Sequence, residues 1–254
     1  MTLTLNFLPQ TAFAFILLFA RTGAMSMALP GIGSQMVPPR IRLVFALALS
    51  LILYPIVSKA FPNLPTSLFG MISSIVSEVL IGIAIGFSVR IIISSIQVAG
   101  TAIAFQTGLA FAQNVDPANG TQSSLFGSFL SILSLALIFS TDMHHLLLSA
   151  IHDSYVLFKP GSALPTGDFA QVAVQTVSGG FRIAIQLAGP FLVFGLIFYL
   201  GVGVLSRLIP QVQVFFLAMP LNITLGFVLF MMLLSSFMLW FLDYVGEAIS
   251  PYLA

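Results

Sequence analysis

The chain has 254 residues, of which 59% are hydrophobic and only 6% are charged, whereas soluble domains carry about 25% charged residues. So few charges cannot form a water-exposed surface, and the mean hydropathy of +1.11 agrees, so most of the chain is predicted to lie in a bilayer. The net charge of +1 gives no reason to expect nucleic acid as a partner, and the absence of cysteine excludes disulfides and zinc–thiolate sites.

Continuous apolar runs predict an all-α integral membrane protein with about six to seven hydrophobic helical segments. About 20 apolar residues span a bilayer as a helix. Only helices and closed barrels pair every backbone group in lipid, and these runs do not alternate as barrel strands do. In chain order the runs lie at 11–30, 41–57, 68–93, 96–112, 124–151, 181–205 and 212–242. The third and fourth runs are compatible with one hairpin or with one long broken helix.

Proline and glycine predict where the segments end. A residue before proline avoids the helical conformation, and Asn-Gly favours a turn. The breaks are expected at Pro30 to Pro39, at Pro55 to Pro65, at Asp116-Pro117 and Asn119-Gly120, and at Pro210 and Pro220, which bracket the last run. The longest polar stretch covers 159–180, and we expect a short extramembrane helix near 169–177.

Two ionisable residues, Arg21 and Glu78, lie deep within apolar runs. A charge at the centre of a membrane helix costs about 2.5–3.5 kcal/mol on insertion scales, so such residues normally have a partner. We therefore expect Arg21 and Glu78 to be paired, either within this chain or across an interface. Five other charges lie near run ends, where their side chains can reach the membrane surface: Arg90, Asp142, Arg182, Arg207 and Asp243.

All three histidines lie in one short segment, 142–153, and raise the question of a metal site. Asp142 is three residues before His145, and His152 is seven residues after it, so the two histidines share a helix face. The segment lacks the His-Glu-x-x-His signature of zinc proteases. We favour a polar helix at the membrane boundary and predict no metal and no cofactor. Without a nucleophile or phosphate-binding motif, the chain is not expected to be an enzyme.

Small residues predict close helix packing. Gly82 and Gly86 form a Gly-x-x-x-Gly pattern, which lets two helices approach closely in lipid. Gly195, Gly201 and Gly203 extend this pattern to a later run.

The stretch from Gln106 to Gln122 is polar and turn-forming, although very apolar runs flank it. Irregular backbone at membrane depth is tolerated only where protein or a water-filled cavity surrounds it. The stretch is therefore either a surface loop or a loop that enters a pore. Its composition alone favours the surface loop, because most loops run over the surface.

Four stretches together carry a family pattern, in an order and spacing that cover nearly the whole chain. The first comprises Arg21, Pro30, Val-Pro-Pro-Arg-Ile-Arg-Leu at 37–43, and Pro55. The second is Leu-Ile-Gly-Ile-Ala-Ile-Gly-Phe at 80–87. The third comprises Gly100, Gln-Thr-Gly-Leu-Ala-Phe-Ala from 106, and Val-Asp-Pro at 115–117. The fourth comprises Arg-Leu-Ile-Pro-Gln-Val-Gln-Val-Phe-Phe at 207–216, Met-Pro-Leu at 219–221, and Gly226. In these features the chain resembles the FliR family of flagellar export-gate proteins, whose injectisome counterpart is SctT.

The resemblance implies a fold and a partner set. Family members are built from kinked helical hairpins, with a FliP-like part that would cover about 1–180 and a FliQ-like part that would cover about 181–254. They join FliP and FliQ, associate with FlhB, and form the core of a gate through which unfolded flagellar subunits cross the bacterial inner membrane. The alternative from the residues alone is a small-solute secondary transporter, with Arg21 and Glu78 in its binding site.

The resemblance also assigns residues. In the family, the stretch after the Gln-x-Gly-Leu motif is a loop that plugs the pore, so the resemblance favours a pore plug over a surface loop here. The plug would comprise Phe111, Ala112, Gln113, Asn114, Val115, Asp116, Pro117, Ala118, Asn119, Gly120, Thr121 and Gln122. The residues expected to serve assembly and interfaces are Arg21, Glu78, Gly82, Gly86, Gln106, Gly108, Arg207, Pro210, Gln211 and Pro220. Glu78 departs from the family, in which that position is often uncharged.

Overall fold

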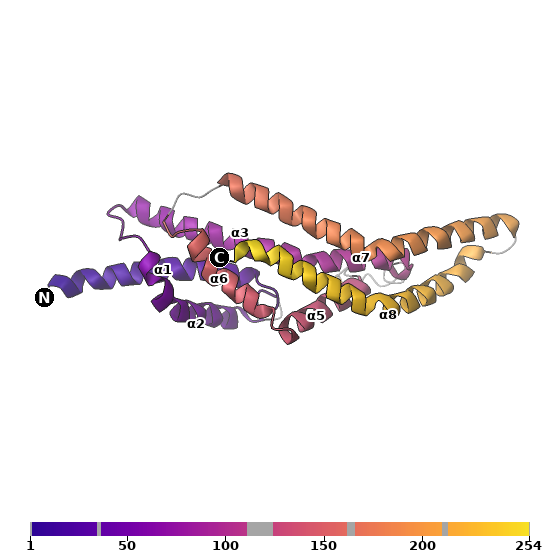
Figure 1. Cartoon of the computed structure of the whole chain (residues 1–254), viewed down its shortest axis with the longest axis horizontal. Coiled ribbons are helices and arrows are strands. Elements are labelled where there is room, and N and C mark those ends of the chain that lie inside the picture. The colour runs from indigo at the N-terminus through magenta and orange to yellow at the C-terminus, as the bar shows by residue number, and fades with distance from the viewer. Residues whose placement is uncertain (1, 35–36, 111–123, 162–165, 210–212, 254) are drawn as a thin grey trace. The chain divides into compact units, whose positions relative to one another are not determined.

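The computed structural model describes residues 2–34, 37–110, 124–161, 166–209 and 213–253, and among them it contains helices and no strand (Figure 1). The prediction of an all-α protein is confirmed. The elements in chain order are α1 (Thr2–Ala28), α2 (Pro39–Val57), η1 (Ser58–Ala60), α3 (Leu68–Gln106), α5 (Leu125–Ser140), α6 (His144–Leu157), α7 (Thr166–Leu208), α8 (Val214–Ile249) and η3 (Ser250–Tyr252).

The chain forms two compact units, to each of which several distant segments contribute. Unit 1 comprises Met1–Ile92, Phe139–Val177 and Gly246–Ala254, and unit 2 comprises Ile93–Ile138 and Ser178–Val245. The helices α3, α5, α7 and α8 therefore contribute to both units. This division differs from the expected FliP-like and FliQ-like parts, which stay a prediction.

In unit 1, α1 packs side by side with α2 and against the first half of α3. The core between these helices is aliphatic and includes Leu17, Leu18, Ile81 and Ile85, none of which is more than 1% exposed. Removing such side chains from contact with solvent or lipid and packing them tightly is the main source of stability in a helical core.

Gly82 and Gly86 bring α3 into close contact with α1. A Cβ atom on Gly82 would lie 2.6 Å from the carbonyl oxygen of Arg21, and one on Gly86 would lie 2.7 Å from the Cβ of Ala28. Only glycine fits at this separation. Small residues in the interfaces of membrane helices generally let the two backbones approach this closely. The Gly-x-x-x-Gly pattern thus packs two helices of this chain, and its role in assembly with other chains stays a prediction.

The core of unit 2 is aromatic. Phe126 of α5 lies between Phe227 and Phe230 of α8, with ring centroids 5.1 Å and 4.4 Å apart, and Phe191 of α7 contacts Phe230. These tilted arrangements are the ones that aromatic pairs prefer. Gly100 of α3 meets α5, and a Cβ atom there would lie 2.5 Å from the backbone of Gly127, the residue after Phe126.

Two expected breaks are absent because long helices continue through them. The runs between 68 and 112 form neither a hairpin nor a broken helix, since α3 is continuous from Leu68 to Gln106. The separate extramembrane helix expected near 169–177 is also wrong, because these residues form the beginning of α7. In both cases the intervening polar or small residues do not interrupt the backbone hydrogen-bond ladder, and tertiary packing extends the helix.

Prolines end fewer helices than their sequence positions predicted. Pro55 lies inside α2, and Pro220 lies inside α8 instead of bordering it. A proline interrupts the ladder, but a nearby hydroxyl can satisfy the carbonyl that loses its donor. Both prolines therefore lie within continuous membrane helices, where the hydrogen bond lost at the proline does not end the helix.

The run expected at 124–151 is broken at 141–143, where α5 ends and α6 begins. Asp142 has a φ of +59°, and it is the one non-glycine residue with positive φ in the described part of the chain. The left-handed conformation costs an L-residue roughly 1–2 kcal/mol, although aspartate tolerates it better than most. The pair α5 and α6 is therefore bent, either as a broken span or as a re-entrant segment.

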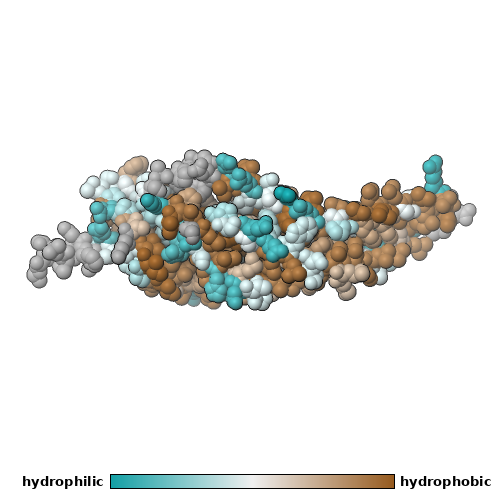
Figure 2. All heavy atoms as spheres, viewed as in Figure 1, coloured by the Kyte–Doolittle hydropathy of each residue, from teal (hydrophilic) through white to brown (hydrophobic). Residues whose placement is uncertain are grey.

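Five helices of the described chain are long and apolar enough to cross a membrane, or up to six if the bent pair counts as one span. The spans in α7 and α8 are only 22% and 28% buried within the protein. Figure 2 shows hydrophobic residues over the part of the molecule in which α7 ends and α8 begins. Large exposed apolar surfaces of this kind are covered in a membrane by lipid or by other helices.

We predict that Gly82→Ala lowers the stability of the protein, whereas Gly203→Ala leaves the stability unchanged or raises it. Alanine at Gly82 collides with α1 and should destabilise the protein by about 1–3 kcal/mol, as overpacking does. A Cβ atom on Gly203 would meet no described atom within 4 Å, so alanine there should be neutral or stabilise α7 by up to about 1 kcal/mol. Thermal unfolding of the purified protein in mild detergent measures both. Equal midpoints for the two variants would contradict the close approach of α1 and α3.

Candidate functional site

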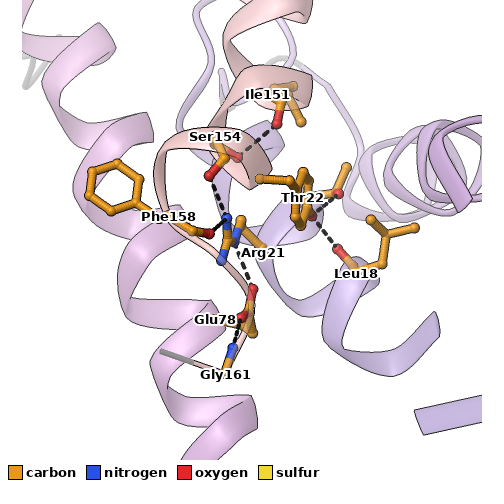
Figure 3. Close-up of polar contacts among 9 residues, drawn as sticks. Leu18, Arg21, Thr22, Glu78, Ile151, Ser154, Phe158 and Gly161 are labelled. Atoms are coloured by element: carbon orange, nitrogen blue, oxygen red, sulfur yellow. Dashed lines mark hydrogen bonds and ion pairs between the residues drawn. The ribbon is translucent and has the colours of Figure 1, made fainter. Parts of the chain in front are cut away.

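Arg21 and Glu78 form a fully buried ion pair in unit 1 (Figure 3). The Nε of Arg21 in α1 donates to the Oε2 of Glu78 in α3 at 2.6 Å, and both side chains are 0% exposed. The short, charge-assisted hydrogen bond neutralises two charges that would otherwise be isolated in an apolar interior. The two ionisable residues that lie deepest in apolar runs are thus each other's partners.

Arg21 also binds the carboxyl-terminal end of α6. Its Nη1 donates to the backbone oxygens of Ser154 and Phe158, at 2.7 Å and 2.8 Å. The last carbonyl groups of a helix have no partner within the helix and carry the negative end of its dipole. The carbonyl of Ser154 already accepts the backbone N–H of Phe158 at 3.0 Å, so Arg21 adds a second donor there and also donates to the carbonyl of Phe158. The guanidinium also places a favourable charge at the end of the helix.

The remaining contacts enclose the pair on its other sides. The second carboxylate oxygen of Glu78 accepts from the backbone N–H of Gly161 at 3.4 Å, and the guanidinium carbon of Arg21 lies 4.4 Å from the ring centroid of Tyr155. The Tyr155 hydroxyl donates to the carbonyl of Leu18 at 3.0 Å and lies 3.0 Å from the Oγ1 of Thr22. The hydroxyl of Tyr155 thereby links α6 to α1, while its ring makes a cation–π contact with the guanidinium of Arg21.

The turn after α6 reaches Glu78 because glycine occupies position 161. Gly161 has a φ of +77°, and a Cβ atom there would lie 2.8 Å from the ring of Pro62. Glycine adopts this conformation without a steric penalty. The pair therefore joins α1, α3, α6 and the turn that follows α6, and its chemistry is that of a structural clamp.

A second polar cluster lies in unit 2, where α3 ends. Asn222 of α8 is 2% exposed, and its Nδ2 donates to the carbonyl of Gln106 at 3.2 Å and to the hydroxyl of Tyr199 at 3.3 Å. The carbonyl groups at the end of a helix lack donors within the helix, and Asn222 of α8 supplies a donor to the carbonyl of Gln106, the last residue of α3. Gly108 follows with a φ of +75°, and a Cβ atom there would lie 3.2 Å from the Asn222 amide.

Glycine at two positions leaves room for the end of α3 to pack closely against α7 and α8. A Cβ atom on Gly195 of α7 would collide with the side chain of Gln106, and one on Gly226 of α8 would collide with that of Thr107. Thr107 is fully buried. The motif Gln-Thr-Gly is therefore held in unit 2 by close contacts with both α7 and α8.

The other expected site residues are spread over the fold. Arg207 is exposed in the last turn of α7, and Pro220 is exposed within α8. The expected plug, 111–122, and the residues Pro210 and Gln211 lie outside the described part of the chain. The five charges that the sequence places near run ends are all exposed. Arg90 and Arg182 nevertheless lie well inside the long helices α3 and α7, and the expected reach of the five side chains toward the membrane surface stays a prediction.

Sequence reasoning missed Asn222 and Tyr199. A signal for Asn222 was present, because it is an amide in the middle of an otherwise apolar run and lies between the Met-Pro-Leu and Gly226 parts of the family pattern. A buried amide in such a position needs hydrogen-bond partners. No pattern in the sequence indicated that Arg21 would bind backbone oxygens of α6.

Comparison with known proteins decides the family. The family model of bacterial export proteins, family 1, matches residues 12–248. The chain is 44% identical to the flagellar biosynthetic protein FliR of Caulobacter vibrioides over 88% of this chain and 90% of that protein. It is 32% identical to FliR of Bacillus subtilis over 87% of this chain and 86% of that protein.

The chain belongs to the FliR family of bacterial export proteins. The likeness extends to FliR of Escherichia coli, which is 30% identical over 78% of this chain and 75% of that protein. Membership confirms the family resemblance of the sequence and agrees with the apolar helices expected of a membrane protein. Both clusters described above, around Arg21 and around Asn222, lie within the part that matches the family model.

We predict that Arg21→Met and Glu78→Gln each destabilise this FliR family member strongly, while the double variant loses less than the sum. Removing one partner leaves an uncompensated buried charge, which costs about 3–5 kcal/mol, whereas removing both charges avoids that penalty. Thermal unfolding of the four proteins in detergent measures the coupling. If the loss of stability in the double variant equalled the sum of the losses in the two single variants, Arg21 and Glu78 would not stabilise each other, which would contradict the ion pair.

Proposed function

We propose that the chain is a pore-forming core subunit of the flagellar protein export gate. It assembles with FliP-like and FliQ-like subunits, and an FlhB-like protein associates with the assembly. Unfolded flagellar subunits pass through its channel across the bacterial inner membrane, in the flagellar basal body. Membership of the FliR family supports the flagellar and export parts of this proposal.

The observation that carries the subunit role is the large uncovered surface of α7. Exposed apolar side chains recur along it at helical spacing, which makes one continuous stripe: Val193, Leu196, Ile197, Leu200 and Val204. Gly201 and Gly203 lie on the same helix, and a Cβ atom added to either would meet no described atom within 4 Å apart from its chain neighbours and the backbone of its own helix. Small residues beside an apolar stripe favour a closely packed partner helix over lipid alone.

The cluster at the end of α3 gives the expected plug a fixed starting point. Asn222 holds the carbonyl of Gln106, and Gly108 turns the chain just before residues 111–122. In this proposal the plug is the yielding part of the gate, and the junction of Gln106, Asn222 and Tyr199 is its rigid base. A polar, turn-forming plug can exclude water and ions and still give way to a passing chain.

A small-solute secondary transporter is the second candidate, and the geometry favours it less. Such a transporter would use Arg21 and Glu78 near the membrane midplane as a binding site. Both side chains are 0% exposed and are already bound to each other and to backbone groups of Ser154, Phe158 and Gly161. A solute could enter only if the clamp of unit 1 came apart.

Native mass spectrometry of the tagged chain, co-expressed with its FliP- and FliQ-like partners and purified in mild detergent, tests the proposal. We expect one large complex that contains all three kinds of subunit. Substitutions on the α7 stripe, such as Leu196→Arg, should reduce the yield of the complex, because a charge would face the partner helix. The exposed charge variant Arg90→Gln serves as the control. A chain that stays monomeric beside its co-expressed partners would contradict the subunit role.

Deleting Asn114–Gly120 should make the gate leak ions without preventing its assembly. The deletion removes the polar turn of the plug and leaves the junction of Gln106 and Asn222 in place. Conductance of purified complexes in planar bilayers is the measurement, with the intact complex in the same bilayers as reference. An unchanged conductance in fully assembled complexes would rule out this loop as the seal.

A further inference from the structure

One group of histidine and acidic side chains in the described part of the chain brings three possible metal ligands together. Asp142, His144 and His145 each offer one ligand atom, and these atoms all lie within 4.8 Å of one another. The group lies at the break between α5 and α6, within unit 1. It shares no residue with the clamp around Arg21 or with the cluster around Asn222.

The backbone of the break holds these side chains on the same side. The positive φ of Asp142 turns the chain back, so the carbonyl of Asp142 accepts the backbone N–H of His145 at 3.0 Å. The carboxylate then lies 4.0 Å from the Nδ1 of His145. A residue kept in a sparsely populated conformation beside two histidines is the kind of outlier from which function can be inferred.

Aromatic contacts orient the two imidazoles. The ring of His144 stacks on Phe139 with centroids 5.2 Å apart, and the centroids of the His144 and His145 rings are 4.2 Å apart. The Nδ1 of His144 is buried and has no hydrogen-bond partner among the described residues. A buried polar atom without a partner is costly, and a ligand at this point would satisfy it.

The sequence alone predicts no metal in this segment, but with these three side chains brought together we propose that Asp142, His144 and His145 form a binding site for a first-row divalent transition-metal ion, for which Zn²⁺ is the probe. Two imidazoles and a carboxylate are donors that such ions accept, whereas Mg²⁺ and Ca²⁺ prefer sites made of oxygen. With metal–nitrogen distances of about 2.0–2.1 Å, small side-chain rotations bring donors within 4.8 Å of one another onto one ion. Three protein ligands leave a fourth position for water or for a donor from another molecule.

A metal ion bound at this site would hold the beginning of α6 in place. His144 is the first residue of α6, and the carbonyl of Ser154, near the other end of α6, is bound by Arg21. A metal ion would fix the beginning of α6 to the turn before it, so that both ends of the helix would be held. The side chains of Asp142 and His145 are 79% and 67% exposed, so the ion can reach them from outside.

The chain offers a matched control for this site. His152 is the third and last histidine of the sequence, and its Nδ1 lies 2.7 Å from a carboxylate oxygen of its neighbour Asp153. It lies on the same helix as His144 but outside the cluster. Because the chain has no cysteine, no thiolate competes for the ion.

Isothermal titration calorimetry with ZnCl₂ tests the site on the full-length chain, purified in mild detergent through a tag that contains no histidine. We expect one Zn²⁺ per chain. The variant His145→Ala should reduce the affinity at least tenfold, because even the loss of a residue that only orients a metal ligand typically costs about 10- to 100-fold. Asp142→Asn should also weaken binding, while it keeps a residue that tolerates positive φ.

The control variant His152→Ala should bind Zn²⁺ as the unchanged protein does. Because both site variants alter exposed side chains, folding should be retained, and size-exclusion chromatography verifies it. Equal Zn²⁺ affinity of the unchanged protein and His145→Ala would overturn the proposal, because the ion would then bind elsewhere. Absence of stoichiometric binding would overturn it as well.

X-ray absorption at the zinc edge gives a second readout, with two imidazole nitrogens at about 2.0–2.1 Å in the bound protein. A thermal midpoint that rises with Zn²⁺ in the unchanged protein, but not in His145→Ala, would support the fixing of α6. A zinc spectrum without imidazole nitrogens would count against the site.

Discussion

A single buried guanidinium organises unit 1. Arg21 lies within a candidate membrane span, where an unpaired charge is costly, so its guanidinium needs an opposite charge and hydrogen-bond acceptors beside it. Glu78 supplies the charge, and the end of α6 supplies two carbonyl oxygens. Because these partners come from α3 and α6, the requirement of one side chain fixes the packing of three helices.

Close approach between backbones is the second constraint, and it depends on the first. The Cβ position at Gly82 lies 2.6 Å from the carbonyl of Arg21 itself, so the glycine that admits α3 also brings Glu78 within reach of the guanidinium. Unit 2 uses the same device at the end of α3, where Gly195 and Gly226 admit Gln106 and Thr107. In an apolar surrounding, van der Waals packing and hydrogen bonds between helices take the place of the hydrophobic effect.

The sequence predicted the helical class well and the helix ends less well. Continuous apolar runs and their lengths were enough to indicate membrane helices, but α3 and α7 continue through stretches in which breaks are expected from sequence. Pro55 and Pro220 lie inside α2 and α8, so a proline in an apolar run does not by itself mark the end of a membrane helix. Conversely, the break at Asp142 has no proline or glycine in it, and a left-handed aspartate could not be foreseen from composition.

The sequence by itself determined that the chain is an all-α membrane protein, that it resembles the FliR family, and that Arg21 and Glu78 need partners. Only the tertiary structure decided that they pair with each other, that Arg21 binds the end of α6, and that Asn222 caps α3. These contacts join residues that are 57, 133 and 116 positions apart. Periodicity and turn chemistry describe neighbours along the chain, whereas a buried charge or amide takes whichever partner the packing of distant helices places beside it.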